Sequence, residues 1–197
     1  MVSDMERNEP RPNGSSTHTL SLLVENKPGV LHRITGLFSR RHYNIASLTV
    51  GPTEVPDYSR ITIVVRLGSK SVEQVVRQVQ KLVPVVEVRE LSPQDLIERE
   101  LLLVKIHTPE SNYSELRALA ETYEATIVDV SPDALVVEAS GPAGKLDALE
   151  ERLRKFGIQE LCRSGRIALE RGFKTLAPPS LKGEAHGELP PPQISPP

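Results

Sequence analysis

The sequence predicts an α+β fold in which the order strand, helix, strand, strand, helix, strand occurs twice. Two features of the chain lead to this prediction. Between residues 18 and 172, segments in which apolar residues alternate, as in half-buried strands, are interspersed with segments in which they recur every three or four positions, as in amphipathic helices. The same order restarts after a break that contains Ser92, Pro93 and Asp95, which are typical of a turn.

The first half opens with a strand over residues 19–25, where apolar and polar residues alternate. A helix follows directly after the dipeptide Pro28-Gly29. Its apolar residues recur at the helical period and predict one buried face, formed by Val30, Leu31, Ile34, Leu37 and Phe38.

Alternation predicts two more strands, over residues 46–50 and 61–65, which a loop with two prolines joins as a hairpin. Ser71 and Gln74 have the spacing of a capping box, in which each side chain bonds the other residue's backbone amide at the start of a helix. The apolar residues after Ser71 predict that helix, and a strand over residues 85–91 completes the half.

The second half is predicted to repeat this plan. Its strands are expected over residues 101–107, 125–130, 134–139 and 158–170. Asn112 with Glu115 is expected to cap the first of its helices, and Pro142 and Gly157 are expected to delimit the second. Short connections and right-handed crossovers then give each half a four-stranded antiparallel sheet with two helices on one face, which is a ferredoxin-like domain.

These elements divide the chain into two domains, residues 18–92 and 98–172, joined by a linker over residues 93–97. We expect residues 1–17 and the proline-rich residues 173–197 to be disordered, because neither segment has the composition of a packed helix or strand. The proline-rich segment is either an extended linker or a polyproline ligand for another protein.

The composition indicates a globular protein that has neither a nucleic acid nor a membrane as its partner. Of the 197 residues 38% are apolar, and the net charge of −2 arises from interspersed charges without a basic patch. No apolar run approaches the roughly 18 residues of a membrane span, and residues 1–16 are too polar for a signal peptide. We therefore expect a cytoplasmic protein.

The chain carries no recognisable catalytic or metal-binding motif. No Walker loop, dinucleotide-binding glycine pattern or HExxH sequence occurs, and no two of the five histidines have the helical spacing of a metal site. Cys162, the only cysteine, is expected to be a small buried apolar residue rather than a nucleophile, since no His or acid stands in a recognisable pattern with it. We therefore expect neither catalytic nor metal-ligating residues.

The junction of the first strand with the first helix is the candidate binding site. The first amides of a helix have no partner inside it, and here Pro28 and Gly29 stand where a Ser, Thr, Asp or Asn cap is usual. These amides are suited to an anionic group, and Gly29 has no side chain to block its approach. The same dipeptide is also typical of an ordinary turn, so both interpretations stay open.

Several longer motifs resemble a known family. The run ENKPGVLHRI at residues 25–34 resembles the signature of ACT domains, which are ferredoxin-like modules that bind free amino acids. With RHYNIASLTVGPT at 41–53 and YSRITIVV at 58–65, it is similar to the small regulatory subunits of acetolactate synthase. The motifs similar to the C-terminal domain of that family are ERELLLVKI at 98–106, DVSPD at 129–133, GKLD at 144–147 and RSGRIAL at 163–169.

This resemblance implies a regulatory subunit and not an enzyme. It implies that the chain activates a large catalytic subunit, which would carry thiamine diphosphate, magnesium and FAD, and that it confers feedback inhibition by valine on branched-chain amino-acid biosynthesis. The alternative is a stand-alone ACT-type sensor of amino acids that regulates another metabolic enzyme.

The resemblance also implies an effector site between the ACT domains of a homodimer. The residues implied for it are Asn26, Gly29, Val30 and Leu31 from one chain, and Asn44 and Ile45 from the other. Amides near Gly29 would receive the α-carboxylate of the amino acid, the side-chain oxygens of Asn26 and Asn44 would accept from its ammonium group, and aliphatic neighbours would enclose its side chain. Without the resemblance, Asn44 would be interpreted as a turn residue that tolerates a left-handed conformation.

Overall fold

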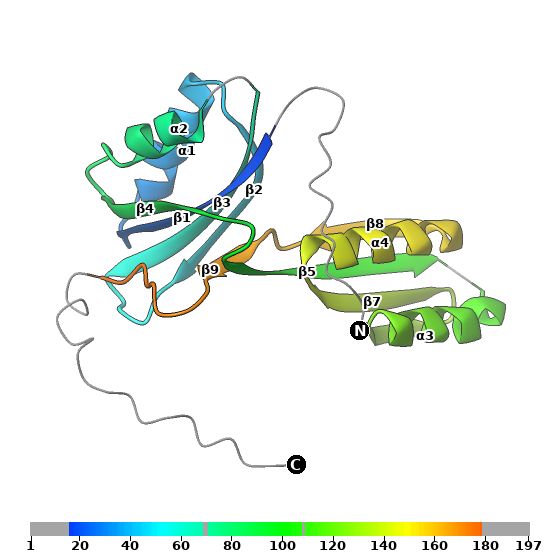
Figure 1. Cartoon of the computed structure of the whole chain (residues 1–197). Helices are drawn as coiled ribbons and strands as arrows, with labels where there is room; N and C mark the ends of the chain where they lie inside the picture. The colour runs from blue at the N-terminus through cyan, green and yellow to red at the C-terminus, as the bar shows by residue number, and fades with distance from the viewer. Residues whose placement is uncertain (1–15, 69–70, 108, 179–197) are drawn as a thin grey trace, which may run out of the picture.

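The structure is a computed structural model that describes residues 16–68, 71–107 and 109–178. The predicted α+β class is confirmed, because the chain forms two ferredoxin-like domains of antiparallel sheets and helices (Figure 1). In each domain two α-helices pack on one face of the sheet, and the long strand β5 (Leu96–His107) leads from the first domain to the second.

The first domain contains six elements in the predicted order. They are β1 (Ser16–Glu25), α1 (Val30–Arg40), β2 (Asn44–Pro52), β3 (Tyr58–Leu67), α2 (Val72–Val79) and β4 (Val85–Leu91). The order of strands in the sheet is β2-β3-β1-β4, so that β2 and β4 form its edges. β2 and β3 form the predicted hairpin, in which Asn44 lies opposite Arg66 and Pro52 lies opposite Ser59.

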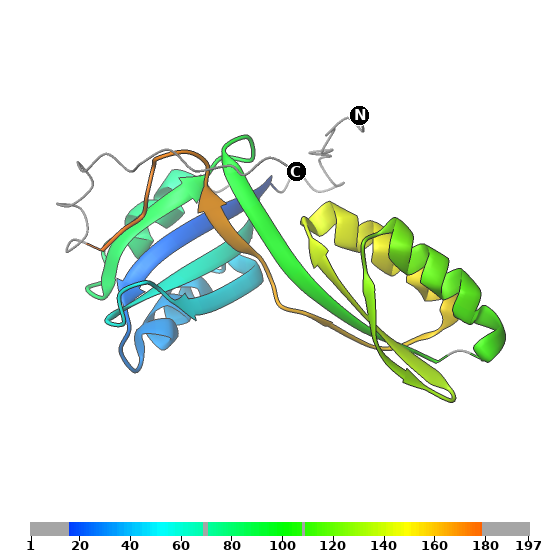
Figure 2. The ribbon, with the colours of Figure 1, turned by 90° about the horizontal axis from the view of Figure 1, so that it is seen from below.

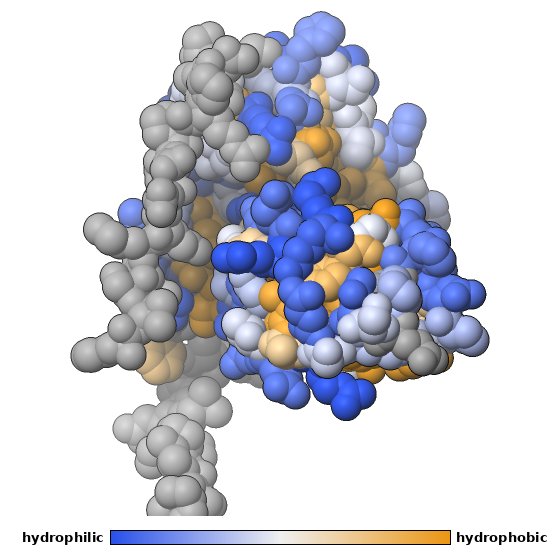
Figure 3. All heavy atoms as spheres, turned by 90° about the vertical axis from the view of Figure 1, so that its right-hand side faces the viewer, coloured by the Kyte–Doolittle hydropathy of each residue, from blue (hydrophilic) through white to orange (hydrophobic). Residues whose placement is uncertain are grey.

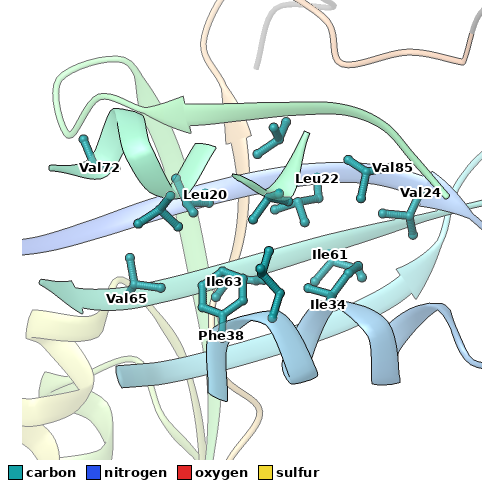
Figure 4. Close-up of a cluster of buried hydrophobic side chains, with 14 of the residues drawn as sticks. Leu20, Leu22, Val24, Ile34, Phe38, Ile61, Ile63, Val65, Val72 and Val85 are labelled. Carbon is teal, nitrogen blue, oxygen red and sulfur yellow. The ribbon is translucent and has the colours of Figure 1, made fainter. Parts of the chain in front are cut away.

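The core of the first domain lies between the sheet and its two helices (Figure 4). Ile34 and Phe38 of α1 are completely buried, and so are Leu20, Leu22 and Ile63 on the strands that they face. These residues are four apart on the helix and two apart on the strand, so the two sequence periods place them on facing surfaces. Each buried side chain of this size contributes roughly 1.5–3 kcal/mol to the stability of the domain.

The second domain repeats this arrangement. Its elements after β5 are the 3-10 turn η1 (Glu110–Asn112), α3 (Tyr113–Thr122), β6 (Thr126–Ser131), β7 (Ala134–Gly141), α4 (Ala143–Leu153), the 3-10 turn η2 (Arg154–Phe156), β8 (Ile158–Arg163) and β9 (Ile167–Glu170). The order β6-β7-β5-β8 matches that of the first sheet, and β6 therefore occupies the place of β2.

The predicted last strand over residues 158–170 is wrong, because two strands replace it. β8 pairs with the C-terminal part of β5, whereas β9 pairs with residues Leu96 to Arg99 at its beginning. Between them Gly165 has a φ of +81°, a left-handed conformation that interrupts a strand. Through its pairing with β9, β5 begins at Leu96, inside the segment that the sequence predicts to be a linker.

β9 and the residues after it cover the face of the first sheet that lies away from its helices (Figure 2). Arg60 Nη2 donates a hydrogen bond of 2.7 Å to the carbonyl of Leu176, whose side chain is buried. Arg89 donates at 3.0 Å to the carbonyl of Thr175 and pairs at 3.0 Å with Glu170. Backbone and side-chain contacts thus attach this segment to the first domain.

The ends of the chain differ in part from the sequence expectations. β1 begins at Ser16, so the last two residues of the N-terminal segment that the sequence predicts to be disordered belong to a strand. Residues 173–178, the beginning of the proline-rich segment, are described and in part buried. Residues 1–15 and 179–197 lie outside the described residues, and with them most of both predicted disordered segments and the possible polyproline ligand.

Three predicted details are wrong. Ser71 lies at the N-cap of α2, but its hydroxyl pairs with Glu73 and bonds no backbone amide, so the predicted capping box does not form. Asn112 lies at the N-cap of α3 without a side-chain capping bond. Cys162 is exposed and not buried, because it lies opposite Leu103 on the face of the second sheet away from the helices.

Candidate functional site

The predicted site has the strand-turn-helix geometry that the sequence indicates. β1 ends at Glu25, and α1 begins at Val30 with Gly29 as its N-cap. Gly29 has a φ of +82° and a ψ of −7°, a left-handed conformation that costs other residues about 1–2 kcal/mol. A Cβ at this position would meet no atom within 4 Å. Glycine is therefore needed for the backbone conformation, and the space beside it is open.

The first turn of α1 has unpaired backbone donors. No side chain caps the helix, and the amides of Gly29, Leu31 and His32 have no hydrogen-bond acceptor within the described residues. The amide of Val30 makes one long hydrogen bond of 3.4 Å to the carbonyl of Lys27. No acidic residue lies in this first turn, so the amides and the helix dipole favour an anionic group from outside.

Asn26 connects this junction to the loop between β2 and β3. Its side-chain amide donates at 2.9 Å to the carbonyl of Pro56, and its backbone amide donates at 2.7 Å to the carbonyl of Asp57. The side-chain oxygen accepts no hydrogen bond from the other described residues, so it is the atom that remains for an ammonium group. The bond to Pro56 gives Asn26 a structural role as well.

Val30 and Leu31 differ in burial. Val30 is 6% exposed and belongs to the core of the first domain. Leu31 is 41% exposed, so its predicted place on the buried face of the helix is wrong. The side chain of Leu31 is therefore available to an apolar ligand at the surface. Val30 lines the junction only through its backbone.

Asn44 lies far from the Gly29 junction within one chain. In the first sheet Glu25 is opposite Tyr58, and Asn44 is opposite Arg66, at the other end of β3. The eight steps from residue 58 to residue 66 of an extended strand span about 27 Å. The six predicted residues therefore form two separate groups, one at each end of the sheet.

The interpretation of Asn44 as a left-handed turn residue is wrong. Asn44 is the exposed first residue of β2, and Ile45 after it packs in part against the core. The left-handed residue of this turn is His42, with a φ of +54°, and Glu124 has the same role in the second domain with a φ of +52°. The sequence analysis does not predict a left-handed conformation for His42, although His is one of the residues that adopt it more often than most.

A shallow hollow lies elsewhere, between α3 and α4 of the second domain. Its lining includes Leu119, Tyr123 and Phe156, and Figure 3 shows apolar side chains between polar ones at this end of the molecule. Lys155 lies 4.8 Å above the ring of Phe156 and pairs with Glu115 at 2.5 Å, so these side chains satisfy one another. Within the described part of the chain, no three His, Cys, Asp or Glu residues gather as a metal site, and no helix is long and apolar enough to cross a membrane.

Comparison with known proteins gives matches over both domains. Residues 20–87 match the model of the ACT domain of AHAS small subunit-like proteins, and residues 99–172 match that of the small subunit of acetolactate synthase. A probable acetolactate synthase small subunit of Methanothermobacter thermautotrophicus is 48% identical over 161 residues, which cover 81% of this chain and 96% of that protein. The acetolactate synthase small subunit of Bacillus subtilis is 44% identical over 159 residues, covering 80% and 92% of the two chains.

A solved structure agrees with these matches. The crystal structure of the acetolactate synthase small subunit from Thermotoga maritima aligns with a TM-score of 0.74 and 36% sequence identity. The alignment covers 80% of this chain and 99% of that one. The similarity therefore extends over the first domain, with all six predicted site residues, and over the second.

Proposed function

Because this chain belongs to the family of acetolactate synthase small subunits, we propose that it regulates the catalytic subunit of that enzyme. The observation that carries the proposal is the match of both halves in order, an ACT domain over residues 20–87 and the small-subunit domain over residues 99–172. The chain would activate the catalytic subunit in the cytoplasm without being an enzyme itself. Thiamine diphosphate, magnesium and FAD would belong to the catalytic subunit.

Valine is the effector that we propose for the Gly29 junction, where it would give feedback inhibition of branched-chain amino-acid biosynthesis. The open amides of Gly29 and Leu31 would donate to its α-carboxylate. The side-chain oxygen of Asn26 would accept from its ammonium group, and the exposed side chain of Leu31 would contact its isopropyl group.

The remaining residues of the site would come from a second copy of the chain. β2 is an edge strand of the first sheet, and Val50 on it is 44% exposed. If two β2 strands paired antiparallel about Leu48, Asn44 of one copy would lie opposite Pro52 of the other. Pro52 is at the end of the sheet that carries the Gly29 junction. A symmetric dimer of this kind would bring together two groups that lie about 27 Å apart in one chain.

Mixing the chain with the catalytic subunit of its own organism tests the proposed function. We expect the chain alone to have no acetolactate synthase activity, and the mixture to be more active than the catalytic subunit alone. Millimolar valine should remove this gain in activity. If the coupling free energy has its usual size, valine should change the activity of the mixture by about 5- to 150-fold. An activity that mixing does not change would contradict the regulatory role, whereas an activated mixture that ignores valine would contradict only the effector.

The substitution Gly29→Asp tests the site. It introduces a carboxylate where the carboxylate of valine would bind, so it should abolish inhibition and retain activation. Gly172→Asp is the matched control, because Gly172 also has a left-handed φ of +75° and no atom within 4 Å of its Cβ position, yet lies outside the site. If Gly29→Asp leaves valine inhibition at the wild-type level, the effector binds elsewhere.

A further inference from the structure

A turn of the second domain lies directly against the edge strand of the first. The turn consists of Ser164, Gly165 and Arg166, which connect β8 to β9. The backbone amide of Arg166 donates a hydrogen bond of 3.0 Å to the hydroxyl of Ser47, and the hydroxyl of Thr49 donates a weak one of 3.5 Å to the carbonyl of Ser164. β2 thus meets the second domain through side chains at its centre.

Gly165 permits this contact in two ways. Its φ of +81° is a conformation that residues with a Cβ rarely adopt. A Cβ at Gly165 would also lie 2.7 Å from Ser47 Oγ and 2.9 Å from Thr49 Oγ1, closer than real Cβ atoms approach other atoms. A larger residue at this position would therefore disturb the contact, because either the hydroxyls of Ser47 and Thr49 or the turn itself must shift.

The strand under this turn also carries the second group of the proposed site. Ile45 and Leu48 pack against the core on the helix side of the sheet. A bulge between Ile45 and Ser47 shifts the register, and Ser47 points to the opposite side, where the turn lies. Asn44 is only three residues from Ser47 on this strand. A change in the position of β2 at Asn44 would therefore reach the turn through one short, continuous segment.

Ion pairs attach the turn firmly to the second domain. Arg166 pairs with Glu98 at 3.2 Å and with Glu100 at 3.3 Å, both on β5. Arg163, just before the turn, donates from Nε to Glu100 at 2.9 Å and pairs with Asp147 on α4 at 2.5 Å. A movement of the turn would therefore disturb its ion pairs with β5 and α4.

We propose that the contact of the Gly165 turn with Ser47 and Thr49 couples effector binding in the first domain to the second domain. This inference rests on the proposed function, because it assumes that an amino-acid effector binds next to β2. Effector binding affects a distant domain only if the protein has two conformations that differ in their affinity for the effector. In this proposal the two conformations differ in the contact between the turn and β2. The packed turn supplies a direct physical connection over which such a difference can act.

Gly165→Ala tests the coupling in the complete complex with the catalytic subunit, and Gly172→Ala is its matched control. Both replace a left-handed glycine, but a Cβ at Gly172 meets no atom within 4 Å, whereas a Cβ at Gly165 collides with the hydroxyls of Ser47 and Thr49. For each variant, calorimetry measures valine binding to the free chain, and assays of the complex measure activation and the valine concentration that halves activity. We expect Gly165→Ala to bind valine within about threefold of wild type and to activate normally, but to need at least about fivefold more valine for inhibition. Gly172→Ala should match wild type in all three measurements.

Each outcome of this experiment decides a question. If Gly165→Ala is inhibited as wild type is, the coupling role is overturned. If the wild-type chain binds no valine, the proposed effector itself is wrong, and the failure is distinguishable from that of the coupling. If Gly165→Ala does not fold, Ser47→Ala replaces it, because this variant removes the hydrogen bond to Arg166 without adding an atom, and wild-type inhibition of that variant overturns the coupling role.

Discussion

Glu100 and Arg163 form an ion pair at the point where the two domains meet. Arg163 donates from Nε to the carboxylate of Glu100 at 2.9 Å, and Glu100 is only 7% exposed. Partial burial lowers the pKa of Arg163, but hydrogen bonds to Asp147 and Glu100 and the charges of these carboxylates outweigh it and raise the pKa above its ordinary value. The guanidinium of Arg166 contacts the same carboxylate at 3.3 Å. The buried carboxylate of Glu100 is thus the shared counter-charge of Arg163 and Arg166.

Glu100→Gln should therefore destabilise the protein by about 2 kcal/mol. It removes the counter-charge that two partly buried guanidinium groups share, a change that costs about 3–5 kcal/mol when a buried charge is left without any partner. The cost is smaller here because Arg163 keeps its pair with Asp147, Arg166 keeps its pair with Glu98, and both keep some contact with water. Glu160→Gln is the control, since the pair of Glu160 with Lys105 is largely exposed and should contribute less than about 1 kcal/mol. Urea unfolding followed by circular dichroism measures both. Equal effects of the two substitutions would show that the burial of Glu100 is unimportant.

Phe38→Ala should lower the free energy of unfolding of the first domain by about 3–5 kcal/mol. The side chain of Phe38 is completely buried and makes an edge contact with the ring of Tyr43, at 5.8 Å between centroids. Phe173→Ala removes the same side chain at a position that is 99% exposed, and should change stability by less than about 0.5 kcal/mol. Thermal and urea unfolding compare the two variants. A loss of stability in Phe173→Ala as large as in Phe38→Ala would mean that Phe173 is buried in solution.

The sequence predicts most elements of this fold because the period of apolar residues is local information. It fails where a contact between distant segments decides the structure. The division of the last strand depends on the left-handed Gly165 and on the pairing of β9 with residues 96–99, and neither follows from local alternation. Cys162 is exposed for a similar reason, because which strand face carries the helices is a tertiary property.

The candidate site was predictable to a similar extent. The open amides beside Gly29 follow from the absence of a capping residue, which the sequence alone reveals. The position of Asn44 at the opposite end of the sheet follows only from strand register. The contact of Gly165 with Ser47 joins residues that are 118 positions apart, and no local sequence pattern predicts it.

Gly29→Ala and Gly144→Ala should have effects of opposite sign on stability. At neither position would an added Cβ meet an atom within 4 Å, so backbone conformation alone decides. At Gly29 the left-handed φ should make alanine destabilising by about 1 kcal/mol. At Gly144, inside α4, alanine should stabilise by about 0.5 kcal/mol because it reduces the freedom of the unfolded chain. Chemical denaturation measures both, and a stabilising Gly29→Ala would contradict the strained conformation.

The ion pair of Glu124 with Lys145 should contribute a stability that depends on pH. The hydrogen bond from Lys145, of 2.7 Å, and the charge of Lys145 lower the pKa of Glu124. Because the folded-state pKa lies below the unfolded one, the stabilisation is present above the unfolded pKa and is lost as the pH falls through the folded pKa. Glu124→Gln should therefore be less stable than wild type at pH 7, and the difference should disappear in acid. Melting temperatures over a pH series measure it, with Glu121→Gln, which removes an exposed carboxylate without an ion pair in the described structure, as the control that shows no such trend.

Complementation between two inactive variants should show that each effector site needs two chains. If Gly29 comes from one chain and Asn44 from the other, neither the homodimer of Gly29→Asp nor that of Asn44→Ala contains a complete site. A mixed dimer of the two then contains one site with both substitutions and one with neither. Random mixing should restore valine binding at about a quarter of all sites, which calorimetric stoichiometry measures. A mixture of Gly29→Asp with Asn26→Ala should restore none, because both residues lie in the same half of the site. Equal binding by the two mixtures would mean that Asn44 does not complete the site of a second chain.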